Sequence, residues 1–281
     1  MATVLDLQRL KDAGQRFAML TAYDYTTARL LDAAGIPVLL VGDSAAMVMF
    51  GHSTTLPITM DELVMLARGV ARGAPTALLV GDLPFLSYQA SVEDAVRSAG
   101  RLLQEGGMHA VKLEGGEEQA LASTRRLVEA GVPVMGHLGL TPQSVHRLGG
   151  FKVQGREAAA AARIAAQAAD LQEAGAFAIV LEAMPATLAA EITATLHIPT
   201  IGIGAGPHCD GQVLVVQDML GMTTGRTPKF AKQFASLGAE VIAAARRYAG
   251  EVESGAFPGA EHTYAGRPAA ALVEQSGHGR P

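Results

Sequence analysis

The sequence predicts an α/β protein whose strands and helices alternate and close into a (β/α)₈ barrel. Over roughly 250 of the 281 residues, short apolar runs alternate with helix-like segments, and about eight runs can be counted. Most of these runs are apolar throughout, as expected for parallel strands covered on both faces by helices. Several follow a glycine that can end the preceding helix, at Gly35, Gly107, Gly131 and Gly175. This pattern favours a closed barrel over an open, doubly wound sheet.

The expected elements follow one another in a regular order along the chain. Strands are expected at residues 17–23, 38–42, 77–82, 110–114, 132–137, 177–182, 199–204 and 212–216. The helices carry start signals, because Thr59-Met-Asp-Glu62 has the spacing of a capping box and Ser91 and Asp24 suit the N-cap position. We expect residues 1–264 to form a single barrel domain with an N-terminal helix. The polar residues 265–281, which show no periodicity, are expected to form a disordered tail.

The composition excludes several classes of protein. Hydrophobic residues make up 49% of the chain and charged residues 17%, which is typical of a globular domain. The net charge of -5 and the lack of a Lys/Arg run argue against nucleic-acid binding. No apolar stretch reaches the length of a membrane helix, and the mixed charges near the N-terminus are unlike a signal peptide. With Cys209 as the lone cysteine, we expect a cytoplasmic protein without an internal disulfide.

Four of the expected strands end on a carboxylate, at Asp43, Asp82, Glu114 and Glu182. The C-terminal ends of barrel strands meet at one mouth, where (β/α)₈ barrels place their active sites. Asp43, Asp82 and Glu114 follow consecutive strands, so their charges would repel one another without a positive charge among them. Oxygen donors without paired Cys or His predict a hard cation, most simply Mg²⁺. The alternatives are a cationic substrate or raised pKa values and, for any single acid, a helix cap or a pair with arginine.

Lys112 and Glu182 are further charged candidates. Lys112 precedes Glu114 by two residues, so both side chains point to the same face of one strand. Lys112 could hold a substrate carboxylate or, less readily, form a Schiff base, and a structural ion pair with a barrel acid is the alternative. Glu182 stands in an apolar frame on the sixth strand, across the mouth from the other acids, and is a candidate general base.

Three uncharged or weakly basic side chains complete the candidates. Ser44, next to Asp43, could donate a hydrogen bond to a bound carboxylate, and Tyr23 at the end of the first strand is a possible supporting residue. His137 ends the fifth strand and could be an acid, a base, a positioning group or a structural histidine. The polar residues 141–156 have the length of a functional loop. The Gly-rich residues 201–206 lack the spacing of a phosphate-binding loop, so close packing is their expected role.

Nine short motifs, taken in order, resemble one enzyme family. They are Thr-Ala-Tyr-Asp24, Val-Gly-Asp43-Ser44, Gly51-His52 followed by Thr-Leu-Pro57, Asp82-Leu-Pro-Phe85, Val-Lys112-Leu-Glu114-Gly-Gly116, Gly136-His-Leu-Gly-Leu-Thr-Pro-Gln143, Val-Gln-Gly-Arg156, Ile-Gly-Ile-Gly-Ala-Gly206 and Pro228-Lys-Phe230. Spread over residues 3–264, they are similar to the ketopantoate hydroxymethyltransferase family of pantothenate synthesis. The chain departs from the family pattern at Ala45-Ala-Met47, where the pattern has Leu-Gly-Met, and in its extra tail after Tyr264.

The resemblance implies a (β/α)₈ barrel of the phosphoenolpyruvate/pyruvate superfamily type, assembled as a homo-oligomer, typically a decamer. It implies hydroxymethyl transfer from 5,10-methylenetetrahydrofolate to 3-methyl-2-oxobutanoate, giving 2-dehydropantoate through a Mg²⁺-stabilised enolate. The family's functional positions carry over to this chain residue by residue. They imply that Mg²⁺ is held by Asp43, Asp82 and Glu114, the oxo acid by Asp43, Ser44, Asp82 and Lys112, and that the proton is accepted by Glu182.

Two other functions agree with parts of the pattern. Another Mg²⁺-dependent oxo-acid lyase or mutase of the same superfamily would share the metal acids, but the block from Gly136 to Gln143 argues against it. A non-catalytic metabolite-binding barrel would share the fold, but the intact set of candidate acids and Lys112 argues against that function.

Overall fold

The computed structural model describes residues 1–225 and 227–265 of the 281-residue chain. Residues 1–235 form one compact unit and residues 236–281 a second, and each is described by itself. The expectation of a single barrel domain over residues 1–264 therefore stays a prediction. The expected disordered tail, residues 265–281, lies outside the described residues apart from Ala265.

Eight parallel strands form a closed barrel in the order of the sequence. They are β1 (Phe17–Thr21), β2 (Val38–Val41), β3 (Leu78–Asp82), β4 (Ala110–Lys112), β5 (Val134–Gly139), β6 (Ala178–Glu182), β7 (Thr200–Ile203) and β8 (Gly211–Leu214). The first strand pairs with the last, with Phe17 opposite Gly211, and this pairing closes the sheet. The predicted (β/α)₈ barrel is confirmed, and each observed strand overlaps its expected range.

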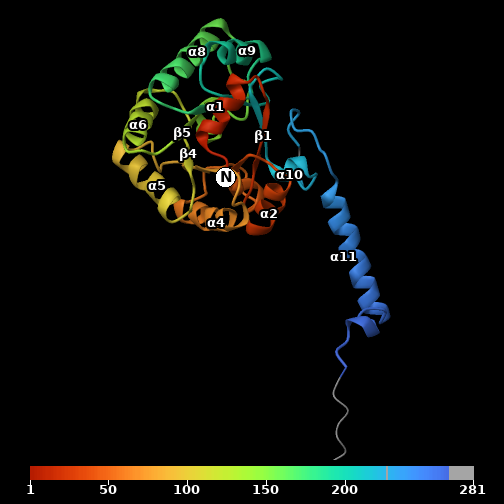
Figure 1. The fold of residues 1–281 in the computed structure, drawn as a ribbon. Coiled ribbons are helices and arrows are strands. Elements are labelled where there is room, and N and C mark those ends of the chain that lie inside the picture. Colours follow the sequence, from red (N-terminus) through yellow and green to blue (C-terminus); the bar gives the residue numbers. More distant parts are fainter. Residues whose placement is uncertain (226, 266–281) are drawn as a thin grey trace, which may run out of the picture. The chain divides into compact units, whose positions relative to one another are not determined.

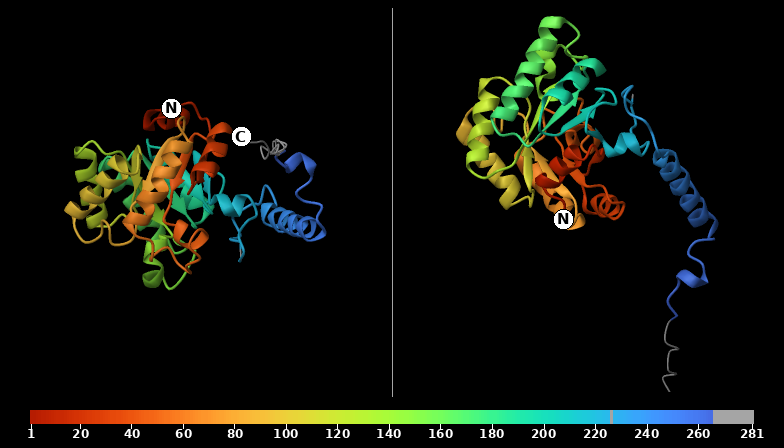
Figure 2. Two further views of the ribbon diagram at one scale, coloured as in Figure 1. Left: turned by 90° about the horizontal axis from the view of Figure 1, so that it is seen from below. Right: turned by 45° about the horizontal axis from the view of Figure 1, so that its top comes forward.

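Helices surround the strands as an outer ring (Figures 1 and 2). The longer helices of this ring are α2 (Tyr25–Ala33), α4 (Met60–Gly73), α5 (Val92–Gln104), α6 (Glu118–Glu129), α8 (Ala158–Glu173) and α9 (Ala186–Thr195), and α1 (Val4–Asp12) lies apart from it. Short turns of helix lie between them: α3 (Ala45–Val48), the 3₁₀ turn η1 (Pro142–Ser144), α7 (Val145–Leu148) and α10 (Val216–Met219). The expected caps are confirmed, because Thr59, Ser91 and Asp24 each accept a hydrogen bond from a backbone N–H of the first turn.

Strand residues alternate between two sets of apolar contacts. In β3, Leu78 and Val80 belong to the cluster inside the barrel, whereas Leu79 packs outward against the helices. This period of two is the geometry of an extended strand, and it decides which face each later side chain takes. The inside of the barrel is therefore filled by apolar side chains from all eight strands, and polar candidates gather only where those strands end.

Helix α1 closes the N-terminal end of the barrel. Leu7 of α1 is 1% exposed and shares the interior cluster with Phe17 at the start of β1. Lys11 pairs with Asp210, just before β8, at 2.8 Å between Nζ and Oδ2, and it donates a second hydrogen bond to the carbonyl oxygen of Thr193. In Figure 1 this helix lies across the middle of the ring. The opposite, C-terminal end of the strands is thus the end left for a site.

The second unit is a helix, α11 (Leu237–Ser254), followed by a 3₁₀ turn, η2 (Ala260–His262). Phe257 links the two, with its ring centroid 5.6 Å from that of Tyr248 and 5.0 Å from that of His262. Across the described part of the chain, none of the helices combines the length and the apolar character that crossing a membrane requires.

Helices α2 and α4 pack closely at Gly73, which gives a prediction for stability. A Cβ atom at Gly73 would lie 2.5 Å from the carbonyl oxygen of Tyr25 and 2.9 Å from the Cβ of Ala28. To relieve this contact the backbone of α2 would have to shift. We therefore expect Gly73→Ala to lower the free energy of unfolding by about 1–3 kcal/mol, the usual cost of overpacking. Urea unfolding followed by circular dichroism measures this difference.

Gly69, one turn earlier in the same helix, is the matched control. Its added Cβ would lie 3.5 Å from the nearest atom, an ordinary contact distance. Gly69→Ala should leave stability unchanged or raise it by up to about 1 kcal/mol, since Ala is the better helix former. Equal losses from the two substitutions would contradict the packing described for α2 and α4.

Candidate active site

The alternation of the strands brings the candidate side chains together at the C-terminal mouth of the barrel. In β3, Asp82 continues the inward face of Leu78 and Val80. The same two-residue spacing from an interior residue holds for Lys112 in β4, His137 in β5 and Glu182 in β6. The charged residues therefore follow the barrel interior because of strand geometry, without any special bend of the chain.

Asp43, Asp82 and Lys112 form one buried group within the site. Their exposed fractions are 4%, 1% and 3%. The backbone N–H of Asp43 donates to Oδ2 of Asp82 at 3.2 Å, and Lys112 Nζ lies 2.8 Å from Oδ1 of Asp82. Lys112 thus forms the structural ion pair that was one of its three predicted roles, and it does so inside the candidate site.

His137 joins this group to the acids of the later strands. Its Nδ1 lies 3.3 Å from Lys112 Nζ and 3.4 Å from Oε1 of Glu114. Its Nε2 lies 3.2 Å from Oε2 of Glu182, within ion-pair distance. Glu114 is buried, whereas Glu182 is partly exposed at the mouth. His137 therefore contacts the acids on both sides of its own strand.

Tyr23 and Ser44 meet beside the acids. The hydroxyl of Tyr23 and Oγ of Ser44 are 2.8 Å apart, and Tyr23 is 1% exposed. Burial raises the pKa of the Tyr23 phenol above its ordinary value, against the lowering effect of its hydrogen bond with Ser44. The phenol therefore stays neutral and acts here as a hydrogen-bonding group.

The backbone around Glu182 is held in an uncommon conformation. Ala183, the next residue, has a φ of 47°, in the left-handed region that residues other than glycine rarely adopt. Three hydrogen bonds fix this turn: Leu140 N–H to Glu182 O, Ala183 N–H to Ile203 O and Gln154 N–H to Ala183 O. A Cβ at Gly139 would collide with the carbonyl oxygen of Glu182. The position of Glu182 thus depends on Gly139 and on two neighbouring segments of the barrel.

Burial, together with crowding, shifts the pKa values of Asp43 and Asp82 upward. Burial raises the pKa of Asp43 well above its ordinary value, and the nearby charges of Asp82 and Glu114 raise it further. Burial also raises the pKa of Asp82, although Lys112 acts in the opposite direction. The site therefore stabilises positive charge placed among these carboxylates.

The charges of the nearby acids also raise the pKa values of the two basic side chains, Lys112 and His137. Burial alone would lower the pKa of Lys112, but the charges of Asp82, Glu114 and Asp43 outweigh burial and raise it. Burial and Lys112 lower the pKa of His137, whereas its contacts with Glu114 and Glu182 raise it to a net value of about 9. Both side chains therefore carry positive charge near neutral pH.

Two residues that sequence reasoning missed also contact the acids. Gln143 in η1 and Tyr88 in the loop after β3 are 5% and 1% exposed, and both hydrogen-bond with Glu114. The sequence offers one signal for Gln143, its place at the end of the block that follows the fifth strand. It offers none for Tyr88, whose hydroxyl reaches the site only through the fold.

The donor set suits a hard cation. Oε1 of Glu114 is buried and makes no hydrogen bond of good geometry to any described residue, and the buried Oδ1 of Asp82 has Lys112 Nζ as its neighbour at 2.8 Å. Among the described residues, no three His, Cys, Asp or Glu side chains are grouped so that they could hold a metal ion together. Mg²⁺ needs no such cage, because it commonly uses one or two carboxylates and completes its shell with water and substrate oxygens. The residues present therefore fit an ion that shares its coordination with a ligand.

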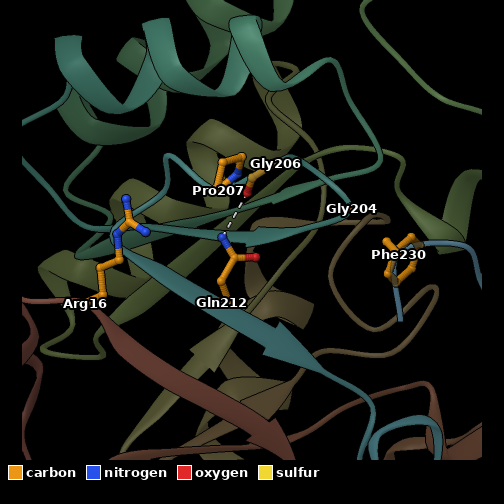
Figure 3. A pocket seen from close by; sticks show the side chains of 6 residues that line it. All are labelled: Arg16, Gly204, Gly206, Pro207, Gln212 and Phe230. Atoms are coloured by element: carbon orange, nitrogen blue, oxygen red, sulfur yellow. Dashed lines mark hydrogen bonds between the residues drawn. The ribbon is translucent and has the colours of Figure 1, made fainter. Parts of the chain in front are cut away.

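Two surface hollows lie apart from these residues. One, of about 400 Å³, lies beside β7 and β8 and is lined by Arg16, Gly204, Gly206, Pro207, Gln212 and Phe230 (Figure 3). The other, of about 340 Å³, is lined by residues 56–60 and 84–87. None of the candidate site residues lines either hollow. A Cβ at Gly206 or Gly204 would strike Ala186 or Phe230, which confirms close packing as the role of residues 201–206.

Comparison with known proteins identifies close relatives. The sequence profile of the ketopantoate hydroxymethyltransferase family matches residues 1–260. The 3-methyl-2-oxobutanoate hydroxymethyltransferase of Mycolicibacterium paratuberculosis is 58% identical over 258 residues, which cover 92% of this chain and 90% of that protein. The enzyme of the same name from Moorella thermoacetica is 56% identical over 262 residues, covering 93% of this chain and 97% of that protein.

Solved structures of low sequence identity share the fold. Phosphonopyruvate hydrolase in complex with oxalate and Mg²⁺ superposes with a TM-score of 0.62 at 12% identity, covering 93% of each chain. The 2,3-dimethylmalate lyase of the PEP mutase/isocitrate lyase superfamily superposes with a TM-score of 0.59 at 16% identity, covering 92% of this chain and 90% of that one. These structures confirm the predicted (β/α)₈ barrel fold.

The sequence match is continuous through the mouth of the barrel and nearly to the end of the described residues. It includes the strand ends that carry Asp43, Asp82, Glu114 and Glu182. With a family profile over residues 1–260 and relatives that match over nine tenths of its length, this chain belongs to the ketopantoate hydroxymethyltransferase family.

Proposed function

We propose that this chain transfers a hydroxymethyl group from 5,10-methylenetetrahydrofolate to 3-methyl-2-oxobutanoate, the first step of pantothenate synthesis. The observation that carries the proposal is the 58% identity, over 92% of the chain, to a relative named for this reaction. In the balanced reaction, C3 of the oxo acid loses a proton and bonds to the methylene carbon of the folate. Water then releases the folate, giving 2-dehydropantoate and tetrahydrofolate.

Asp43, Asp82 and Glu114 would hold the divalent cation that the reaction uses, which we take to be Mg²⁺. The buried Oε1 of Glu114, which lacks a hydrogen bond of good geometry among the described residues, supports this assignment, as do the raised pKa values of Asp43 and Asp82. When bound, Mg²⁺ supplies Lewis-acid stabilisation of the negative charge that develops on the oxo acid after proton loss.

Lys112 and Ser44 would bind the oxo acid together with Asp43 and Asp82. The ammonium group of Lys112 is buried, positively charged and directed at the acids from the floor of the mouth. It can meet the carboxylate of the substrate while Asp82 keeps it in place. Ser44 lies beside Asp43 with its hydroxyl oriented by Tyr23, so it can donate a hydrogen bond to the same anion.

Glu182 would accept the proton from C3. It comes from β6, while Asp43 and Asp82 follow β2 and β3, so it faces the substrate from the other side of the mouth. His137 holds the Glu182 carboxylate from one side, at 3.2 Å between Nε2 and Oε2. Holding a base and an electrophile at opposite faces of one bound enolate favours addition through orientation.

We also propose a cytoplasmic homo-oligomer, for which the family resemblance implies a decamer. The single cysteine, Cys209, supports a reducing compartment. Leu30 on α2 and Met65 on α4 are 67% and 60% exposed, and contacts between copies would cover such side chains. The rival assignment to a lyase or mutase of the superfamily has less support, because the sequences of those solved structures are 12–16% identical to this chain, far below the 58% of the relative named for the proposed reaction.

The direct test is product formation by the purified protein. With both substrates and Mg²⁺ we expect 2-dehydropantoate, detected by mass spectrometry, and its loss when the ion is removed by EDTA. In D₂O without folate, we expect deuterium to enter C3 of the oxo acid. Exchange without any product would instead favour an oxo-acid enzyme of other specificity, and the absence of both would favour a binding protein.

Replacing the proposed base should separate binding from proton transfer. We expect Glu182→Gln to bind the oxo acid within a few-fold of wild type but to lose C3 exchange by about a hundredfold or more, the usual contribution of a general base. Calorimetry and NMR measure the two quantities. Glu173→Gln, an exposed position at the end of α8, is the control and should behave as wild type. Exchange at the wild-type rate in Glu182→Gln would refute the assignment.

Removing a proposed metal ligand should weaken the binding of the ion. We expect Asp82→Ala to raise the dissociation constant for Mg²⁺ by about tenfold or more, since changes in less direct contacts already cost that much. It also leaves Lys112 buried without its partner, so the melting temperature should fall. Asp170→Ala, at an exposed site, serves as the control. Unchanged Mg²⁺ affinity in calorimetry would contradict the ligand assignment.

A further inference from the structure

Gln143 connects two of the acids that lie on different strands. Its side-chain Nε2 donates to Oδ2 of Asp43 at 3.0 Å and to the carbonyl oxygen of Leu83 at 2.9 Å. Its backbone N–H donates to Oε2 of Glu114 at 3.0 Å. One residue from the segment after β5 therefore binds carboxylates that follow β2 and β4.

The orientation of the Gln143 amide is determined by its neighbours. Its oxygen, Oε1, accepts hydrogen bonds from the Tyr88 hydroxyl at 3.0 Å and from Nε2 of Gln89 at 2.8 Å. A flipped amide would place that oxygen against a carboxylate and a carbonyl oxygen, which are both acceptors. The observed orientation satisfies both hydrogens and the oxygen of the amide, so Asp43 always faces a donor.

Tyr88 contacts both Gln143 and the backbone of Glu114 through its hydroxyl. Its hydroxyl accepts from the backbone N–H of Glu114 at 3.0 Å and lies 3.1 Å from the carbonyl oxygen of Glu114. Since it is 1% exposed, water cannot replace these contacts. The backbone of Glu114 and the amide of Gln143 thus share one buried hydroxyl as their common support.

These contacts select which oxygen of each acid remains for a ligand. Oδ2 of Asp43 and Oε2 of Glu114 are used by Gln143. Oε1 of Glu114 is left without a hydrogen bond of good geometry among the described residues, with His137 Nδ1 at 3.4 Å, whereas Oδ1 of Asp82 faces Lys112 Nζ at 2.8 Å. Carboxylates that were free to rotate would exchange the roles of their two oxygens.

We propose that Gln143 is a positioning residue that fixes Asp43 and Glu114 for the divalent cation, and that Tyr88 holds the amide of Gln143 in the required orientation. The inference rests on the proposed function, because it assumes the Mg²⁺ site at these acids. It gives a physical role to the block Gly136-His-Leu-Gly-Leu-Thr-Pro-Gln143, whose last residue reaches across the mouth to the acids.

The length and chemistry of glutamine suit this role. Asparagine is shorter by one methylene and would not span the same two acceptors from the same backbone position. Glutamate would add a carboxylate beside Asp43, whose pKa already lies well above its ordinary value because of burial and its acidic neighbours. Methionine has a similar shape but no donor, so it removes the hydrogen bonds of the side chain alone.

The test compares Gln143→Met with Gln172→Met in the full-length protein. Gln172, in α8, accepts hydrogen bonds from the backbone N–H groups of His197 and Ile198 and belongs to no part of the candidate site, so it is the matched control. We expect Gln143→Met to raise the calorimetric dissociation constant for Mg²⁺ by about 10–100-fold, the usual effect of losing a group that orients a ligand. Gln172→Met should stay within about twofold of wild type.

A second readout distinguishes positioning from a role in stability alone. In Gln143→Met, raising the Mg²⁺ concentration should restore much of the C3 exchange rate, because the ion and not the base is affected. A lower melting temperature with wild-type Mg²⁺ affinity would overturn the inference. If Gln143→Met fails to fold, Tyr88→Phe tests the same chain of contacts, because Tyr88 holds the Gln143 amide. We expect this variant to bind Mg²⁺ several-fold more weakly. Unchanged Mg²⁺ affinity in Tyr88→Phe would also overturn the inference.

The wild-type protein separates this inference from the proposed function. Mg²⁺ binding by wild type with equal binding by Gln143→Met would refute the role of Gln143 and leave the metal site standing. Absence of Mg²⁺ binding by wild type would refute the metal site itself and the inference with it.

Discussion

The structure depends on how several carboxylates of like charge are buried together at the C-terminal end of the barrel. Asp43, Asp82 and Glu114 are each at most 6% exposed, and their mutual repulsion adds to the cost of burial. Lys112 offsets part of this cost from within the cluster, through its 2.8 Å contact with Asp82. Buried charges tolerate few arrangements, so the neighbours of these residues are constrained in turn.

The strand order of the barrel separates two kinds of chemistry. The segments from β2 to β4 carry the buried acids and Lys112, whereas β6 carries Glu182 at the partly exposed edge. His137 on β5 lies between them and contacts both Glu114 and Glu182. In the proposed reaction, ion and oxo acid are therefore held on one side of the mouth while the proton leaves on the other.

The backbone around the site is as specific as its charges. Gly139 permits the close approach of the Glu182 carbonyl, and the turn at Ala183 is fixed by bonds to two neighbouring segments. The segment after β5 also supplies Gln143, which reaches the acids across the mouth. On the side of β7 and β8, by contrast, glycines serve close packing, and the hollow there contains none of the candidate site residues.

The barrel, its eight strands and the acids at the strand ends could be predicted from the amino-acid sequence alone. Those features depend on local periodicity and on the alternation of strand residues between two faces, which a single chain displays directly. The pairing of Lys112 with Asp82, the contacts of His137 with two acids, and the place of Gln143 and Tyr88 in the site became visible only in the folded chain. Gln143 lies 100 positions from Asp43, and contacts over such separations arise from how the strands close, which no local pattern records.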